Sequence, residues 1–312
     1  MARFARSARV MLCVLGLQGA AYCHEQPEKV TVCQLKNAPP AYNHKLIEVT
    51  AFVSHDFEDF TVFDPTCSSW PDVWLEYGGT SKSGTMYCCG VTDDRHRPKE
   101  LVVEKIPVTL TVNDEFRKFD KLIQPPFRSE RHGSIVHATL VGRFFAGEPQ
   151  RFAKGNPWGG FGHMGCCTLL AIQEIKSVDS QDRDDLDYGA SPDQPDTNRT
   201  GCGYRDLTPL GPTVELIEAQ QRAESGQEKW AFEHPERVAA DALGRLAAIK
   251  EPIIGIKQRR KAQGRIVYEW RPAKTRSKYM VVMTRPYWLS FYARDPKRVA
   301  WVVAAAYESC GN

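Results

Sequence analysis

The sequence predicts a β-barrel domain followed by a small α+β domain. Apolar and polar residues alternate repeatedly through the first half of the chain, while helical and strand patterns share the C-terminal third. Between these parts, residues 179–212 are rich in Asp, Pro and small polar residues, which is typical of a solvated linker. We therefore expect the barrel over residues 30–178 and the α+β domain over residues 213–312.

The barrel is predicted from a series of short strands. Residues 45–54 form the first strand, because every second residue from Ile47 to Val53 is apolar. Further strand patterns occupy residues 60–63, 73–77, 101–112, 134–145 and 168–175. Residues 113–123 instead repeat apolar side chains at helical spacing after Asn113, a favourable N-cap. The pattern thus predicts five or six strands and one helix.

This order of elements resembles the OB-fold of exported bacterial proteins. The resemblance rests on KLIEVTAFV followed by FTVFD, on IVHATLVGRFFAGE and on the closing TLLAIQEI. It covers about residues 30–178, and the C-terminal part resembles no family. It implies a Greek-key barrel of five strands with a helix before the fourth, a fold that commonly binds oligonucleotides or oligosaccharides. It implies no particular activity.

The first residues are predicted to direct export. Three arginines precede a short apolar run at residues 10–17, and small residues follow. This pattern indicates a signal peptide over residues 1–23 and a periplasmic or secreted protein. Lipidation of Cys23 is the alternative, disfavoured because the bulky Tyr22 precedes it. The remaining sequence has no apolar stretch long enough to span a membrane.

Eight cysteines follow the predicted signal peptide, and an even number in an exported protein favours disulfides. The disulfide candidates are Cys33, Cys67, Cys88, Cys89, Cys166, Cys167, Cys202 and Cys310. Neighbouring residues of an extended chain point to opposite faces, so we expect each adjacent pair to be divided between two different partnerships. The alternative is free or buried thiols.

A metal site competes with the disulfide interpretation. His163 and Cys166 are three residues apart, and Cys88 and Cys89 would complete a tetrahedral zinc site. Oxidation of exported thiols weighs against it, so we expect no cofactor and keep zinc as the alternative. The glycine-rich loop before Cys166 contributes candidate ligand-binding residues, namely Trp158, Phe161 and His163. A tight loop without a ligand explains the same glycines.

The C-terminal part is predicted to be basic and of mixed secondary structure. Helices are expected at residues 212–227, 235–248 and 295–307, and strands at residues 264–270, 278–283 and 287–292. Residues 252–298 hold thirteen Lys or Arg against two acidic residues. Arg259, Arg260 and Lys261 are the candidate binding residues within this segment. Behind an export signal, such cations favour an anionic envelope component or polysaccharide, or the acidic linker itself, over nucleic acid.

Together these patterns favour a non-enzymatic binding protein or an envelope-associated structural protein. The sequence contains no catalytic signature and no pair of carboxylates suited to glycan hydrolysis. The alternative is a metal-binding or thiol-active protein that uses the Cys88/Cys89 pair with His163, Cys166 and Cys167.

Overall fold

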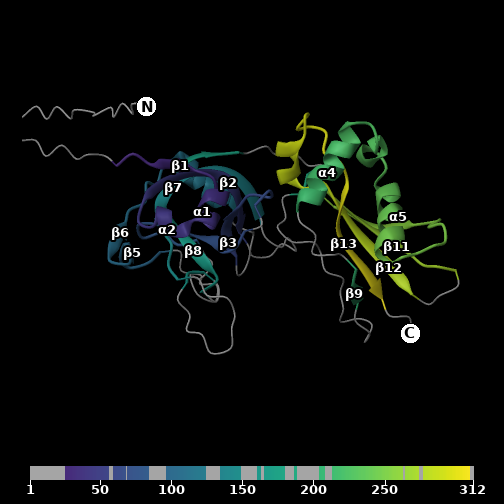
Figure 1. Ribbon diagram of the computed structural model, residues 1–312, viewed down its shortest axis with the longest axis horizontal. Coiled ribbons are helices and arrows are strands. Elements are labelled where there is room, and N and C mark those ends of the chain that lie inside the picture. The colour runs from purple at the N-terminus through teal and green to yellow at the C-terminus, as the bar shows by residue number, and fades with distance from the viewer. Residues whose placement is uncertain are drawn as a thin grey trace, which may run out of the picture.

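Two compact parts of the protein lie side by side in the computed structural model, as Figure 1 shows. The N-terminal part is a barrel coloured purple to teal, and the C-terminal part is coloured green to yellow. The structure describes residues 25–55, 59–67, 69–83, 96–123, 134–148, 160–162, 165–179, 186–187, 204–207, 213–262, 264–273 and 277–309.

The N-terminal part contains a closed barrel of five strands. These strands are β2 (Leu46–His55), β3 (Phe60–Phe63), β4 (Asp72–Tyr77), β7 (Ser134–Phe145) and β8 (Cys167–Val178). The strand order is β2-β3-β4-β8-β7, and β7 pairs with β2 along the whole length of β2, which closes the barrel. The β4–β8 pair is parallel, and the other pairs of the barrel are antiparallel. The barrel predicted from alternation is confirmed.

Shorter elements surround the barrel. They are β1 (Glu28–Val30), α1 (Val32–Asn37), α2 (Pro39–Tyr42), β5 (Leu101–Val103), β6 (Ile106–Val108) and α3 (Asp114–Ile123). Strand β1 extends the sheet by pairing in parallel with β2. Thr31 begins α1 with a capping box, in which its hydroxyl accepts from the Gln34 amide and the Gln34 side chain accepts from the Thr31 amide.

The barrel core is built from the residues that alternate along its strands. Ile47 and Val49 of β2 are fully buried, as are Leu140 and Phe144 of β7. Helix α3 contributes Phe116, Phe119 and Ile123 to the same core, because these residues recur on one helical face. The Asn113 side chain accepts a hydrogen bond from the Phe116 amide at 2.7 Å, which confirms the predicted N-cap.

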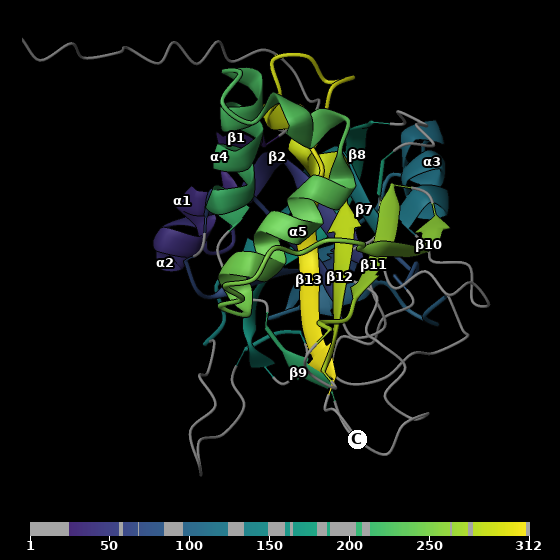
Figure 2. The same ribbon diagram turned by 90° about the vertical axis from the view of Figure 1, so that its right-hand side faces the viewer.

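The C-terminal part contains a second sheet of five strands. Its order is β10-β11-β12-β13-β9, with all pairs antiparallel. The strands are β9 (Tyr204–Asp206), β10 (Lys257–Ala262), β11 (Arg265–Trp270), β12 (Lys278–Thr284) and β13 (Val302–Ser309). Helices α4 (Thr213–Glu224) and α5 (Pro235–Leu246) precede β10, together with the 3₁₀ helix η3 (Lys229–Phe232). Figure 2 shows α5 lying across β11, β12 and β13.

Three predicted elements differ from the structure. Residues 101–112 form no single strand, because the chain turns at Glu104 and Lys105, which both have positive φ, and β5 and β6 pair as a hairpin. The strand expected at residues 287–292 is the 3₁₀ helix η4 (Tyr287–Tyr292). The helix expected from Asp295 onward is wrong, because Val302–Ser309 is β13, paired on both sides within the sheet.

Parts of the acidic segment 179–212 are packed against the second sheet. Leu186 is fully buried, and the Asp187 carboxylate forms an ion pair with Arg265 and accepts a hydrogen bond from the Thr284 hydroxyl at 2.7 Å. Strand β9 lies within the same segment and pairs with β13. These contacts are not those of a solvated linker, and the acidic composition alone does not predict them.

A cluster of buried apolar residues joins the two parts. Phe52 of β2 and Ile135 of β7 pack with Ile217 of α4 and Leu289 of η4. The ring of Phe291 lies 5.2 Å from the ring of Phe52, measured between centroids. Helices η4 and α4 therefore cover the outer face of the barrel at Phe52 and Ile135. None of the helices in the described part of the chain is long and apolar enough to cross a membrane.

Candidate functional site

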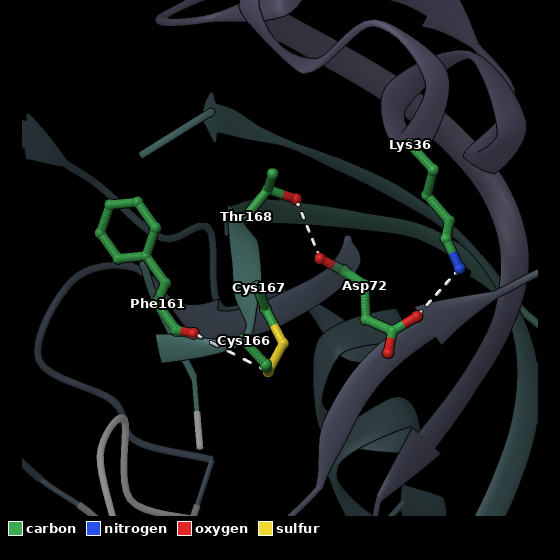
Figure 3. Close-up of a disulfide and its surroundings, with 6 residues drawn as sticks. All are labelled: Lys36, Asp72, Phe161, Cys166, Cys167 and Thr168. Atoms are coloured by element: carbon green, nitrogen blue, oxygen red, sulfur yellow. Dashed lines mark hydrogen bonds and ion pairs between the residues drawn. A yellow bond between two sulfur atoms is a disulfide. The ribbon is translucent and has the colours of Figure 1, made fainter. Parts of the chain in front are cut away.

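One end of the barrel carries a disulfide between adjacent residues. Cys166 and Cys167 are bonded to each other, with their Cα atoms 3.7 Å apart. Figure 3 shows this disulfide beside Asp72 of β4, which is paired in register with Cys167. Cys167 is the first residue of β8 and is 1% exposed, whereas Cys166 precedes the strand and is half-buried.

This bond corrects the expectation that Cys166 and Cys167 belong to different partnerships, whereas the same expectation for Cys88 and Cys89 lies outside the described residues. That expectation requires both residues to be part of one extended strand, so that their side chains point to opposite faces. The strand begins only at Cys167, so strand alternation does not govern Cys166. The zinc alternative requires Cys166 to bind the metal as a thiolate, and a disulfide-bonded Cys166 has no thiolate.

Phe161 lies against the barrel next to the disulfide. Its amide donates to the Cys167 carbonyl at 2.8 Å, and the Cys167 amide donates to the Phe161 carbonyl at 3.0 Å. Its half-buried ring lies 6.4 Å from the ring of Phe145. The next residue, Gly162, has a φ of 72° and lies against the indole of the buried Trp74. Phe161 thus packs on the barrel as part of the wall.

Several predicted site residues fall outside the described residues. They are Cys23, Cys88, Cys89, Trp158, His163, Cys202 and Cys310. In the part of the chain that the structure describes, no group of three or more His, Cys, Asp or Glu side chains could hold a metal ion. Cys33 and Cys67 carry free thiols and are both half-buried.

The predicted basic residues form an exposed cationic edge on the second sheet. Strand β10 is the first strand of the sheet, and its antiparallel pairing with β11 leaves its other side without a strand among the described residues. Its sequence is KQRRKA, and every residue from Lys257 to Lys261 is exposed. We call Lys257, Arg259, Arg260 and Lys261 the β10 cations. The structure therefore places Arg259, Arg260 and Lys261 together.

A buried carboxylate anchors this edge. Glu269 of β11 is 7% exposed, and its carboxylate accepts two hydrogen bonds from the Arg259 guanidinium, at 2.8 Å and 3.0 Å. Lys278 lies 2.8 Å and Arg271 lies 3.3 Å from the same carboxylate. Burial alone raises the pKa of Glu269, but the hydrogen bonds and charges of Arg259 and Lys278 outweigh it and hold the pKa at about 2.

A register shift explains how Arg259 reaches this carboxylate. The pairing of β10 with β11 is irregular between Gln258 and Arg260, so Arg259 is an extra residue on the edge strand. The Arg259 guanidinium can therefore form its ion pair with Glu269. Lys257 and Lys261 lie on either side of Arg259 along the exposed strand. No sequence motif marks Glu269 as a site residue. Glu269 lies between Tyr268 and Trp270, which both face the core, so strand alternation predicts that its side chain points to the opposite face of the sheet.

Comparison of the chain with protein-family models, with curated proteins and with solved structures finds no match.

Proposed function

We propose that this chain is an exported, non-enzymatic binding protein that holds an extended anionic polysaccharide of the cell envelope along β10. The observation that carries the proposal is the run of exposed β10 cations on a sheet edge. Export is proposed from the basic and apolar pattern of residues 1–23 alone.

An OB-like assignment of the barrel belongs to the same proposal. The strand order β2-β3-β4-β8-β7 and the position of α3 between β4 and β7 support it. We likewise propose that the small α+β domain expected at residues 213–312 also includes β9 and carries the β10 cations on its exposed edge. In this arrangement the barrel serves as a scaffold and the second sheet presents the charge.

The shape of the edge suits a linear ligand. A strand rises about 3.3 Å per residue, so the six residues of β10 extend over about 20 Å. Four of these six residues are cations, and none is acidic. Charges on an edge strand also prevent strand addition by another chain. The density of charge along β10 favours attraction of a polyanion.

Glu269 compensates one of the β10 cations, Arg259, within the protein. Glu269 is engaged by Arg259, Arg271 and Lys278, and two of these cations lie outside the strand. Lys257 and Lys261 remain exposed at the two ends of the β10 run. The metal-binding alternative needs a free Cys166 thiolate, and the thiol-active alternative depends on Cys88, Cys89 and His163 outside the described residues. The β10 edge therefore supports the function best.

The test is binding of polygalacturonate by the protein, measured by titration calorimetry at low and high salt. We expect binding that weakens steeply with salt, because exposed charges are screened. Lys257→Gln together with Lys261→Gln should weaken binding about tenfold, which corresponds to about 1.4 kcal/mol. The Arg259–Glu269 contact remains intact in this variant.

The matched control removes two charges from the barrel. Lys99→Gln with Lys121→Gln changes the net charge equally at exposed positions, and it should leave the affinity for polygalacturonate unchanged. The neutral polysaccharide dextran should not bind. Equal weakening by the two double variants, or equal binding of dextran, would refute the proposal. Preferential binding of phosphatidylglycerol vesicles over polygalacturonate would refute the choice of ligand.

A further inference from the structure

Helix α1 is held against the connection between β3 and β4 by polar contacts. The Lys36 ammonium donates to the Asp72 carboxylate at 2.9 Å, and Lys36 itself is 6% exposed. The Ser69 hydroxyl donates to the side-chain oxygen of Asn37 at 2.6 Å. Two residues of α1 thus contact the segment that begins after β3 and ends at the start of β4.

Cys33 and Cys67 take part in the same docking. Cys33 precedes Lys36 and Asn37 by one helical turn, so it lies on the same face of α1. The Ser69 hydroxyl that donates to Asn37 also accepts a hydrogen bond from the Cys67 thiol at 3.8 Å, so Cys67 lies beside the face of α1 that carries Cys33. The backbone amide of Cys67 donates to the Asp64 carbonyl at 2.9 Å, which further defines its position.

From this arrangement we propose that Cys33 and Cys67 are redox partners that form a disulfide between α1 and the β3–β4 connection. The docking contacts of Lys36 and Asn37 hold this face of α1 against the connection that carries Cys67. Both thiols are half-buried, so a small oxidant reaches them from solvent. This pairing is separate from the function proposed for β10.

The oxidant is a molecule that itself contains a disulfide. The Cys67 thiolate attacks one sulfur of that disulfide, and the first oxidant thiol leaves. Cys33 then loses its proton and attacks the Cys67 sulfur of the mixed disulfide, which forms the new bond and releases the second oxidant thiol. Two protons and two electrons leave the cysteine pair, and the oxidant accepts both electrons as it becomes two thiols.

The surroundings of the pair indicate the order of these two attacks. Burial, the neighbouring Cys67 and the charge of Asp64 raise the pKa of Cys33 to about 11. The Cys33 thiol therefore stays protonated near neutral pH, and a protonated thiol is a poor nucleophile. Cys67 accordingly reacts with the oxidant first, and Cys33 resolves the mixed disulfide.

The pairing can be read directly by peptide mapping. Trypsin releases Cys33 in residues 30–36 and Cys67 in residues 46–82, and each of these peptides contains a single cysteine. The reduced protein is oxidised with oxidised glutathione while folded, its remaining thiols are alkylated, and its peptides are analysed by mass spectrometry. We expect a crosslink between these two peptides, at much higher yield than in a sample oxidised in concentrated urea.

Single substitutions test the order of attack. Cys33→Ser should accumulate a glutathione mixed disulfide on Cys67, whereas Cys67→Ser should leave Cys33 largely unmodified. The reverse pattern would overturn the assigned order. The pairing itself is overturned if the folded protein yields no more of the crosslink than the unfolded chain, or if either cysteine is bonded to residues 155–176, the tryptic peptide that contains Cys166 and Cys167.

Discussion

Glu76 and Glu269 show that buried carboxylates of one chain can titrate in opposite directions. Glu76 is 3% exposed and Glu269 is 7% exposed. Burial raises the pKa of Glu76 to about 7, although the Arg97 guanidinium lies 2.9 Å away and opposes the increase. At Glu269 burial acts in the same direction, but Arg259 and Lys278 together hold the pKa at about 2. The number of cations in contact with each carboxylate therefore decides whether its pKa lies above or below the ordinary value.

Glu76 makes the stability of the protein depend on pH. Its folded pKa of about 7 lies above its ordinary value of 4.5, so the folded protein keeps a proton that the unfolded chain loses between these values. The free energy of unfolding should therefore rise as the pH falls from about 7 to about 4.5, by at most about 3 kcal/mol. Glu76→Gln should abolish this rise in urea denaturation curves measured across the same pH window.

The control for this prediction is Glu100→Gln, which changes an exposed carboxylate. It should keep the pH dependence of the unmodified protein. Glu269 does not interfere, because its contribution is present above its ordinary value of 4.5 and is lost as the pH falls toward about 2. An unchanged pH dependence in Glu76→Gln would show that Glu76 is ionised throughout the window.

The sequence indicated some of the candidate site residues but not how they are arranged. The cations at Arg259, Arg260 and Lys261 are evident from composition, but their shared edge depends on β10, which alternation did not reveal. The disulfide between Cys166 and Cys167 depends on where β8 begins, a boundary that a pattern locates only approximately.

At the scale of elements, periodicity identified the barrel because its strands have one buried face. The predicted strand at residues 134–145 matches β7 to the residue. The sequence pattern of β13 predicts a helix because the strand is buried on both faces. Ala306 packs in the cluster beneath α5, while Ala305 and Tyr307 pack in a cluster on the other face. Consecutive apolar residues then lack the alternation that marks a strand.

The packing of residues 160–162 against Trp74 of β4 requires a glycine at position 162. A Cβ atom at Gly162 would lie 2.5 Å from the ring of the buried Trp74, and the φ of 72° disfavours any other residue. Gly162→Ala should therefore reduce the free energy of unfolding by about 2–4 kcal/mol in urea denaturation. Gly226→Ala provides the control, since Gly226 has a φ of 89° and open space around the added methyl group.

Gly226→Ala should cost only the backbone strain, about 1 kcal/mol. The difference between the two variants then measures the contact with Trp74. Equal losses would show that the segment moves away from Trp74 without cost, so that this contact does not hold it on the barrel.

At the scale of the whole molecule, the apolar cluster around η4 couples the barrel to the second sheet. Leu289 is fully buried in this cluster with Phe52 and Ile135 of the barrel. The Tyr287 hydroxyl also donates to Asp179 at 3.0 Å, just after β8. Leu289→Ala should lower the free energy of unfolding by about 2–5 kcal/mol, because a cavity forms at the junction.

The loss of stability in Leu289→Ala is measured by thermal unfolding. The unfolding is followed by tryptophan fluorescence and by far-ultraviolet circular dichroism. Because the cluster is shared, both signals should change in one transition for the unmodified protein. Leu122→Ala, at a position 38% exposed on α3, should cost under about 1 kcal/mol. Two separate transitions in the unmodified protein, or equal losses in both variants, would show that the junction does not couple the parts.

The junction also determines which surfaces remain available for binding. Helices α4 and η4 cover the outer face of β2 and β7, while β10 lies at the first position of the second sheet. The acidic segment compensates part of the basic charge through the contact of Asp187 with Arg265, and Glu269 compensates Arg259. Lys257 and Lys261, exposed at the two ends of the β10 run, are what the proposed polysaccharide would contact.

The most direct test of this account is nuclear magnetic resonance mapping of the bound ligand. Oligogalacturonate is titrated into isotope-labelled protein, and the shift of each backbone amide is recorded. We predict that the largest shifts fall on residues 257–262 of β10 and decrease as salt is added. Shifts confined to the barrel, or no shifts on β10 at saturating ligand, would contradict the proposed binding edge.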